Sequence, residues 1–267
     1  MTGEDEELFA PFLALRPEAA GAARLHQQGA GDRKRGHARP PRRAAALSRE
    51  EIVRAAIAIA DAEGPEAISM RRIARELNAG TMSLYWHVAS KEELLDLMLD
   101  TLQGEQQVPE PSGDWMADLS ALARSSRAAL HEHRWMMDFM GGRPPVGPKS
   151  LQNIERTLAS LDGLRLDKAT AITIVMTVVT YVLGAVLREV QEINGERMMR
   201  ERFAHLTEEE KENAMRDFTD RIREGYPHMA AMIEQGVDPD AADTRDARFE
   251  YGLACLLDGV AARLPAR

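Results

Sequence analysis

Cysteine is nearly absent from this chain of 267 residues, in which Cys255 stands alone. A single thiol excludes an intramolecular disulfide and a metal site built from cysteine thiolates, and it agrees with a reducing compartment. Glu132 and His133 lie side by side, but Met136 and Met137 stand where a zinc-binding helix would place its next histidine. We therefore expect no metal and no cofactor.

Strand-forming and aromatic residues are also scarce. The chain has six Phe, four Tyr and three Trp, and its β-branched residues are concentrated in one segment. Alanine, leucine, arginine and glutamate, which all favour helices, dominate the rest. The composition predicts an all-α fold.

Long hydrophobic runs are missing, with one exception. Residues 169–187 contain no charged side chain, but they include several threonines and a glycine. The first residues of the chain are acidic and lack the basic and apolar sequence of a secretory signal. We expect the uncharged run to be a helix buried in a soluble core, and the protein to be cytoplasmic and independent of membranes.

Positive charge is in deficit overall, with a net charge of −9, but it is unevenly distributed. Residues 33–43 hold six basic side chains and no acidic one. Residues 1–47 are rich in Gly, Pro, Ala and Arg without an apolar period, so we expect a mostly disordered extension. Its basic part, 33–43, is either an arm along a nucleic acid or a solvated tail.

Regular helical patterns begin at residue 48. Ser48 and Glu51, and later Ser90 and Glu93, have the spacing of a capping box, in which each residue satisfies a free amide of the other. Between them, residues 78–80 (Asn-Ala-Gly) can adopt the left-handed turn that ends a helix sharply. The expected helices here begin at Ser48, Ser69, Thr81 and Ser90. Further helices are expected near 114–140, 148–162, 167–193, 207–224, 227–235 and 243–263, with a third capping box at Thr207 and Glu210.

A helix, a sharp turn and a short helix form the helix-turn-helix pattern. Leu84 is the apolar anchor of the short helix and should face Ile73 and Leu77 of the helix before it. The remaining side chains of the short helix then point outward, where a DNA duplex would cover them. These outward residues are Thr81, Ser83, Tyr85, Trp86 and His87.

The stretch "SMRRIARELNAGTMSLYWHVASKEELL", residues 69–95, resembles the DNA-binding domain of the TetR family of one-component bacterial regulators. "LYWHV" followed by a "K-[ED]-x-L-L" helix start carries the resemblance, which is close over residues 47–102. The rest of the chain is similar in length and helical character only. The resemblance implies a helix-turn-helix domain at 48–102 and a larger helical domain at 103–267 that dimerises and binds a small molecule.

The resemblance also implies which residues touch DNA. Ser69 and Met70 open a helix that contacts phosphate, Arg71 takes the place of a base-reading or phosphate-binding arginine, and Lys91 that of a phosphate clamp. The turn and the short helix add Gly80, Thr81, Met82 and Ser83, with Tyr85, Trp86 and His87 as an aromatic wall against the backbone. The alternative is that Tyr85 or Trp86 packs partly in the protein core.

In the helix expected at 167–193, threonines recur on one stripe beside an apolar surface. Such a surface can line a small-molecule pocket, with the aromatic and methionine cluster near residue 137 as its other wall. Alternatively, the hydroxyls bond to carbonyls of their own helix and the cluster is plain core. The expected pocket residues are Trp135, Met136, Phe139, Met140, Thr173, Met176, Thr177, Thr180 and Tyr181.

The last helix has an apolar stripe next to a stripe of small residues, which would suit a two-fold interface of late helices. Packing within one chain is the alternative, and in either case Cys255 should be a small buried group. The expected interface residues are Phe249, Gly252, Leu253, Leu256, Leu257 and Val260.

These features together predict a homodimeric, ligand-responsive repressor that binds a palindromic DNA operator and is released by a small molecule. No catalytic residue is expected, because no nucleophile elbow, phosphate loop or metal spacing occurs. Two alternatives stay open. One is a helical enzyme with an appended DNA-binding domain, and the other is a ligand-independent regulator that acts through a protein partner.

Overall fold

The computed structural model describes residues 47–106, 108, 110–139, 147–238 and 241–264. These residues contain helices and connecting segments and no strand, which confirms the all-α prediction. The expected extension at 1–47, including the basic segment 33–43, lies outside them except for its last residue. The predicted loop at 141–148 is likewise described only from Gly147 onward.

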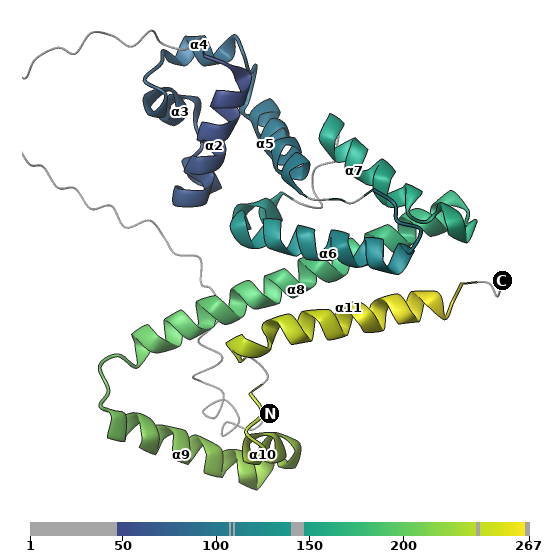
Figure 1. Cartoon of the computed structure of the whole chain (residues 1–267). Coiled ribbons are helices and arrows are strands. Elements are labelled where there is room, and N and C mark those ends of the chain that lie inside the picture. Colours follow the sequence, from purple (N-terminus) through teal and green to yellow (C-terminus); the bar gives the residue numbers. More distant parts are fainter. Residues whose placement is uncertain (1–46, 107, 109, 140–146, 239–240, 265–267) are drawn as a thin grey trace, which may run out of the picture. The chain divides into compact units, whose positions relative to one another are not determined.

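Four helices form the first part of the described chain (Figure 1). They are α2 (Arg49–Glu63), α3 (Met70–Glu76), α4 (Thr81–Tyr85) and α5 (Lys91–Glu105), with the short 3-10 turn η1 (Pro65–Ala67) between α2 and α3. α2 packs against both α3 and α5, while α3 packs against α4. Their shared core includes the fully buried side chains of Ile52, Ile73, Leu84, Leu94 and Met98.

The second part begins with α6 (Trp115–Glu132), η2 (Arg134–Asp138) and α7 (Pro148–Ala159). After η3 (Asp162–Leu164) come α8 (Lys168–Arg202), α9 (Glu208–Gly225) and α10 (Pro227–Glu234), and η4 (Ala242–Thr244) leads into α11 (Arg245–Ala261). α8 packs against both α6 and α11, and α5 against α7. The long helix α8 is thus the element on which the apolar faces of α6 and α11 are buried (Figure 1).

Capping chemistry explains where several of these helices begin. Both halves of the predicted capping box form at Ser48 and Glu51, and again at Thr207 and Glu210. At Ser90 only one half forms as expected: the serine hydroxyl accepts from the amide of Glu93. The Glu93 carboxylate instead accepts from the amide of Ala89, one residue before the cap, at 2.6 Å.

Two predicted helix boundaries are wrong, the first of them for a tertiary reason. The helix expected at 114–140 ends at Glu132, because His133 leaves helical geometry and its Nδ1 bonds Oδ1 of Asp61 on α2 at 2.8 Å. The helix expected at 167–193 continues to Arg202. Arg200 and Arg202 lie in its last turn, where positive charge is favourable to the helix dipole.

The uncharged run in α8 is not wholly buried, contrary to the prediction. By length and composition α8 could cross a membrane, and 33% of its most apolar window is buried in the protein. Ile174, Val178 and Val182 are buried on its inner face. The other face leaves Met176 and Leu187 exposed. The periodicity therefore marks one packed face and one open apolar face.

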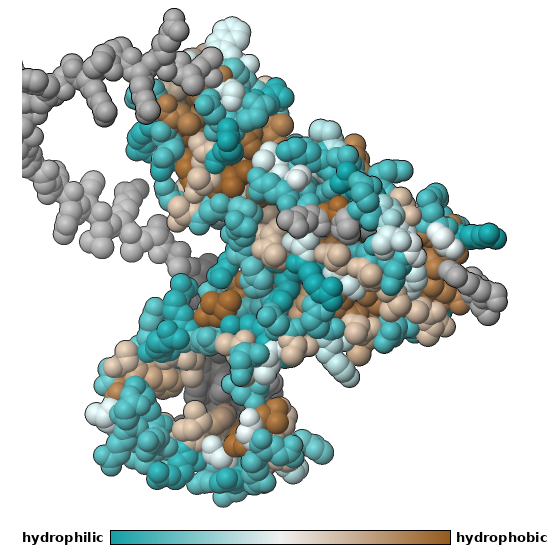
Figure 2. Space-filling model, viewed as in Figure 1, coloured by the Kyte–Doolittle hydropathy of each residue, from teal (hydrophilic) through white to brown (hydrophobic). Residues whose placement is uncertain are grey.

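α9 and α10 pack against each other and carry exposed apolar side chains. Figure 2 shows hydrophobic residues among the hydrophilic ones in this part of the surface. The exposed members are Met215, Met229, Met232, Ile233 and Val237.

Candidate functional site

The turn between α3 and α4 has the geometry that the sequence predicts. The hydroxyl of Ser69 caps α3 by accepting from the amide of Arg72 at 3.1 Å. At the other end of α3, the amide of Ala79 donates to the carbonyl of Ala74 at 2.8 Å, and Asn78 has a φ of 50°. This left-handed residue closes the helix and turns the chain into α4.

α4 is held by one side chain and leaves most of the others bare. Leu84 is fully buried, as predicted, and Val88 just after the helix is buried as well. Met82 is 71% exposed, Tyr85 45% and Trp86 86%. A soluble protein rarely leaves so much apolar and aromatic surface together unless it covers it with a partner.

The end of this segment is tied to neighbouring helices. Arg49 on α2 donates from Nε to the carbonyl of His87 at 2.9 Å and forms an ion pair with Glu93 on α5 at 3.5 Å. His87 itself is half-buried. The aromatic segment is therefore anchored at both ends while its outer face stays open.

The other predicted DNA-binding residues are mostly exposed. Ser69, Arg71, Gly80, Ser83 and Lys91 are exposed and Thr81 is half-buried. Met70 differs, because its side chain is buried in the core of this part. The prediction that Met70 contacts DNA is therefore wrong for its side chain, which packs in the core, and only its backbone could meet a phosphate.

Acidic partners engage one of the nearby arginines. Arg72 pairs with Glu63 and with Glu76, at 2.7 Å each. The hydrogen bond from Arg72 lowers the pKa of the Glu63 carboxyl. Arg71 and Lys91 form no ion pair with another described residue and present their charge to solvent.

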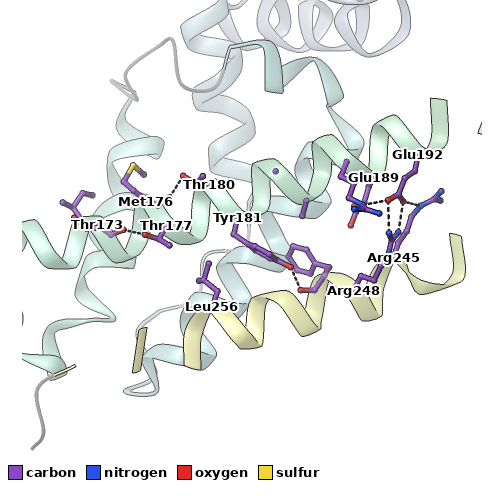
Figure 3. Close-up of a pocket in the computed structure, with 15 residues that line it drawn as sticks. Thr173, Met176, Thr177, Thr180, Tyr181, Glu189, Glu192, Arg245, Arg248 and Leu256 are labelled. Carbon is purple, nitrogen blue, oxygen red and sulfur yellow. Dashed lines mark hydrogen bonds and ion pairs between the residues drawn. The ribbon is translucent and has the colours of Figure 1, made fainter. Parts of the chain in front are cut away.

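A groove of about 970 Å³ runs between α8 and α11 (Figure 3). Five of the predicted pocket residues line it: Thr173, Met176, Thr177, Thr180 and Tyr181. The hydroxyls of Thr173, Thr177 and Thr180 donate to carbonyls four residues back, at 2.7 to 2.8 Å. As the alternative interpretation predicts, these hydroxyls donate to carbonyls of their own helix, and each oxygen can still accept a hydrogen bond.

The other predicted wall lies elsewhere. Trp135 is 5% exposed and Met136 is fully buried, while Phe139 is half-buried with its ring edge-to-face on Trp135 at 6.1 Å. Trp135 and Thr180 both line a second hollow of about 940 Å³ beside α2 and η2. Met140 is outside the described residues. The structure thus does not bring the two predicted walls together around the α8–α11 groove.

Tyr181 connects the groove to α11. Its hydroxyl donates to the carbonyl of Phe249 at 2.7 Å, and burial raises the pKa of the phenol. Gly252 lies directly under the tyrosine, so close that an added Cβ would collide with the hydroxyl. Gly252 therefore permits the close contact between α11 and Tyr181 of the same chain. The sequence predicted close helix approach at this glycine but left open whether the other helix belongs to the same chain.

One end of the groove is charged, which sequence reasoning missed. Glu192 on α8 accepts from Arg188 on its own helix and from Arg245 and Arg248 on α11 (Figure 3). Burial alone would raise the pKa of Glu192, but the hydrogen bonds from Arg248, Arg188 and Arg245 lower it to about 2. Only the spacing of Arg188 and Glu192, four residues apart, was visible in the sequence.

A second charged cluster links three helices, and we call it the α6–α8–α11 clamp: Arg127, His131, Glu189 and Asp246. The carboxylate of Glu189, which is almost fully buried, accepts from Nε of Arg127 at 3.1 Å and lies 2.5 Å from Nε2 of His131. Arg127 also pairs with Asp246 at 2.8 Å. Its guanidinium stacks over the ring of Phe249, 4.6 Å from the ring centre.

The predicted interface stripe on α11 faces inward. Phe249, Leu253 and Leu257 are buried in the core of their own chain, so they offer no surface to a partner. Gly252, Leu256 and Val260 are half-buried. The outward face instead carries Tyr251, which is 75% exposed, and Cys255, which is exposed rather than buried as expected.

Comparison with known proteins identifies both parts of the chain. Residues 52–98 match the bacterial regulatory proteins of the tetR family, and residues 108–264 match the tetracyclin repressor-like C-terminal domain. The transcriptional repressor DrrR1 of Streptomyces coeruleorubidus is 35% identical over 218 residues, which are 80% of this chain and 77% of that protein. The class A tetracycline repressor of Escherichia coli is 27% identical over 220 residues, 81% of this chain and 92% of that protein.

Solved structures agree. The ActR protein of Streptomyces coelicolor, in complex with actinorhodin, has 31% sequence identity and a TM-score of 0.61, over 81% of this chain and 96% of that one. The match spans both the helix-turn-helix elements and the helices that follow. The chain therefore belongs to the TetR family and is a ligand-responsive, DNA-binding transcriptional repressor.

Proposed function

We propose that the open face of α4, together with Arg71 and Lys91, is the surface that binds the operator. The observation that carries this proposal is the exposure of Met82 on α4, where Leu84 is the buried side chain, and of Trp86 directly after it. A helix held by one face and bare on the other is what insertion into the major groove requires.

The residues divide into two roles. Tyr85, Trp86 and His87 follow the reading face and would lie against the sugar-phosphate backbone, with Lys91 as a point charge on a phosphate. Arg71 and Ser83 are the polar side chains placed to reach base edges. Ser69, the backbone of Met70, Gly80 and Thr81 complete the surface.

The chain divides its tasks, with residues 48–102 for DNA and 103–267 for the effector and the dimer. The two family matches, at 52–98 and 108–264, support this division. Operator recognition by two half-sites needs a dimer, since one five-residue recognition helix buries too little surface alone.

For the dimer we propose the outward faces of α8 and α11. Met176, Leu187 and Tyr251 are exposed apolar or aromatic side chains on these faces. A second copy laid against them would also close the open side of the α8–α11 groove. The interface proposed here differs from the one predicted from the sequence. On α11 it uses the exposed Tyr251 in place of Phe249, Leu253 and Leu257, which are buried in their own chain.

For the effector we propose a polycyclic molecule of the tetracycline or actinorhodin kind. The names of two relatives support this class: a tetracycline repressor, and ActR bound to actinorhodin. The apolar groove wall with Met176, Thr177 and Tyr181 is the proposed contact surface, and the charged end at Glu192 suits a polar edge of the ligand. Release of DNA would follow if the ligand prefers a dimer whose recognition helices are mis-spaced.

We further propose that the protein only binds its effector, without turning it over, and that it acts in the cytoplasm where operator DNA is found. The test is incubation of the protein with tetracycline and with actinorhodin, followed by mass spectrometry. Recovery of unchanged compounds supports a regulator, whereas a product that depends on the protein would support the enzyme alternative.

The operator surface is tested by fluorescence anisotropy with operator and scrambled duplexes at several salt concentrations. Lys91→Ala should weaken binding to both duplexes alike and lower the salt slope by about one per protomer. Tyr85→Phe removes a single hydroxyl, so about 0.5–1.5 kcal/mol of binding free energy should be lost at unchanged melting temperature. Variants that bind DNA like the parent but melt much lower would show that these residues are core.

A further inference from the structure

The segment formed by α4 and the three residues after it, which we call the recognition segment, lacks charged and amide side chains. Residues 81–88, TMSLYWHV, contain no Arg, Lys, Asn, Gln, Asp or Glu. Those are the side chains that make paired hydrogen bonds to guanine or adenine, or accept from cytosine, in the major groove. α4 therefore has no side chain that could read these bases in this way.

Met82 is the one long side chain that α4 itself presents to solvent on the face opposite its anchor. Two residues along a helix correspond to a rotation of about 200°, so Met82 points away from the buried Leu84. At 71% exposure its thioether gains almost nothing from the fold. Ser83 beside it is short, and Gly80 before it has no side chain at all.

Of the charged side chains near α4, Arg71 on α3 is exposed and is the one proposed above to reach base edges, whereas two others are engaged by protein partners. Arg72 is held by Glu63 and Glu76, and Arg49 by Glu93 and the carbonyl of His87. An arginine that leaves such partners for a base would forfeit charge-assisted hydrogen bonds. Within α4 itself, the apolar tip of Met82 is therefore the long side chain at the centre of the reading face.

Double-stranded DNA presents only one apolar group in the major groove, which is the 5-methyl group of thymine. Methionine is well suited to it, because its flexible, polarisable side chain adapts to irregular apolar surfaces. Gly80 adds to the fit: its φ is −76°, and an added Cβ would meet nothing in the protein closer than Oγ of Ser83 at 3.6 Å. The fold itself does not require a glycine there, so its open space is available to an approaching duplex.

We propose that Met82 is a specificity-determining residue that packs on the 5-methyl group of a thymine in each operator half-site. Preference at that position then arises from apolar contact rather than from hydrogen bonds. The inference rests on the proposed function, in which α4 enters the major groove.

The test uses a duplex selected by the purified full-length protein from a random library. Each thymine is replaced in turn by deoxyuridine, which removes the methyl group and leaves base pairing intact, and affinity is measured by fluorescence anisotropy. At the thymine that Met82 contacts, the parent protein should bind about fourfold more weakly per methyl group lost. Replacement in both half-sites should give about fifteenfold.

Met82→Ala should bind the thymine and uracil duplexes equally, while Ser83→Ala should keep the full uracil penalty. Both side chains are exposed, so circular dichroism should show parent-like melting for both variants. An equal uracil penalty in the parent and in Met82→Ala, or no penalty at any thymine, would overturn the proposal.

Two further variants separate this outcome from failure of the operator surface itself. If Trp86→Ala and Lys91→Ala weaken operator binding while uracil is neutral, only the thymine contact is wrong. If those variants also bind like the parent, α4 is not the DNA surface and both proposals fail.

Discussion

The α4 surface exposes apolar side chains, whereas the α6–α8–α11 clamp buries charged ones. Met82 on α4 and Trp86 just after it lie in solvent, whereas the clamp buries the carboxylate of Glu189 between Arg127 and His131. Neither arrangement is the one that hydrophobic burial alone would select.

The contrast shows two ways in which a helical protein departs from the simple pattern of apolar inside and charged outside. Exposed apolar groups on α4 add little to stability and are available to a partner. Buried charges in the clamp are costly to desolvate, and removal of one partner leaves the others buried without their counter-charge. Substitutions should therefore change binding at the first region and folding at the second.

The largest difference should appear when a tryptophan is removed from the exposed segment after α4 and another from the buried core at η2. Trp135→Ala, at a position 5% exposed, should lower the free energy of unfolding by about 3–5 kcal/mol. Trp86→Ala should leave it unchanged within about 0.5 kcal/mol and weaken operator binding about tenfold. Urea denaturation and anisotropy measure the two quantities, and similar stability losses for both variants would refute the contrast.

Neutralising the clamp should have the next largest effect. Glu189→Gln keeps the volume but removes the charge that Arg127 and His131 face, and we expect a loss of about 3 kcal/mol in urea denaturation. The matched control is Arg124→Ala, which breaks the solvent-exposed pair with Glu250 and should cost at most about 1 kcal/mol. Equal losses would mean that the buried pair is no stronger than the exposed one.

The pH dependence of stability should report Glu192. Its pKa in the folded protein, about 2, lies below the ordinary value of 4.5, so its stabilising effect is present in full above pH 4.5. That effect is lost as pH falls from 4.5 through about 2. Urea denaturation at pH 7, 4 and 3 should show a smaller decline for Glu192→Gln than for the parent protein, starting from a lower stability at pH 7. Parallel declines would exclude Glu192 as the titrating group.

The smallest expected change lies at the start of α2. Ser48→Ala removes the hydroxyl that accepts from the amide of Glu51, and about 1 kcal/mol of unfolding free energy should be lost. Ser83→Ala on the open face of α4 is the control, and it should leave the urea midpoint in place. A shift of the same size in both would indicate that the serine cap adds nothing specific.

The sequence by itself determined the features that depend on near neighbours. Capping at Ser48 and Thr207, the left-handed Asn78 and the inward Leu84 follow from residues within one or two turns of each other. The same local pattern carried the family resemblance. The caps and the left-handed turn could be predicted because their hydrogen bonds and steric preferences are short-range.

Tertiary structure decided which side of each apolar helix is covered, and by what. Helical spacing showed that Phe249, Leu253 and Leu257 share a face, but whether that face meets its own chain or a partner depends on where α8 lies. The same holds for Cys255 on the opposite side, which is exposed. Helical periodicity shows which residues share an apolar face, but it does not show which part of the protein or which partner packs against that face.

The charged contacts show the same limit most clearly. Arg127 and Glu189 are 62 positions apart, and Trp135 donates to Asp61 across 74 positions at 2.7 Å. No local pattern marks such pairs, because partners this far apart in the sequence share no helical turn. Packing of α6 on α8, which is driven by their apolar faces, brings Arg127 to Glu189, and packing of η2 on α2 brings Trp135 to Asp61.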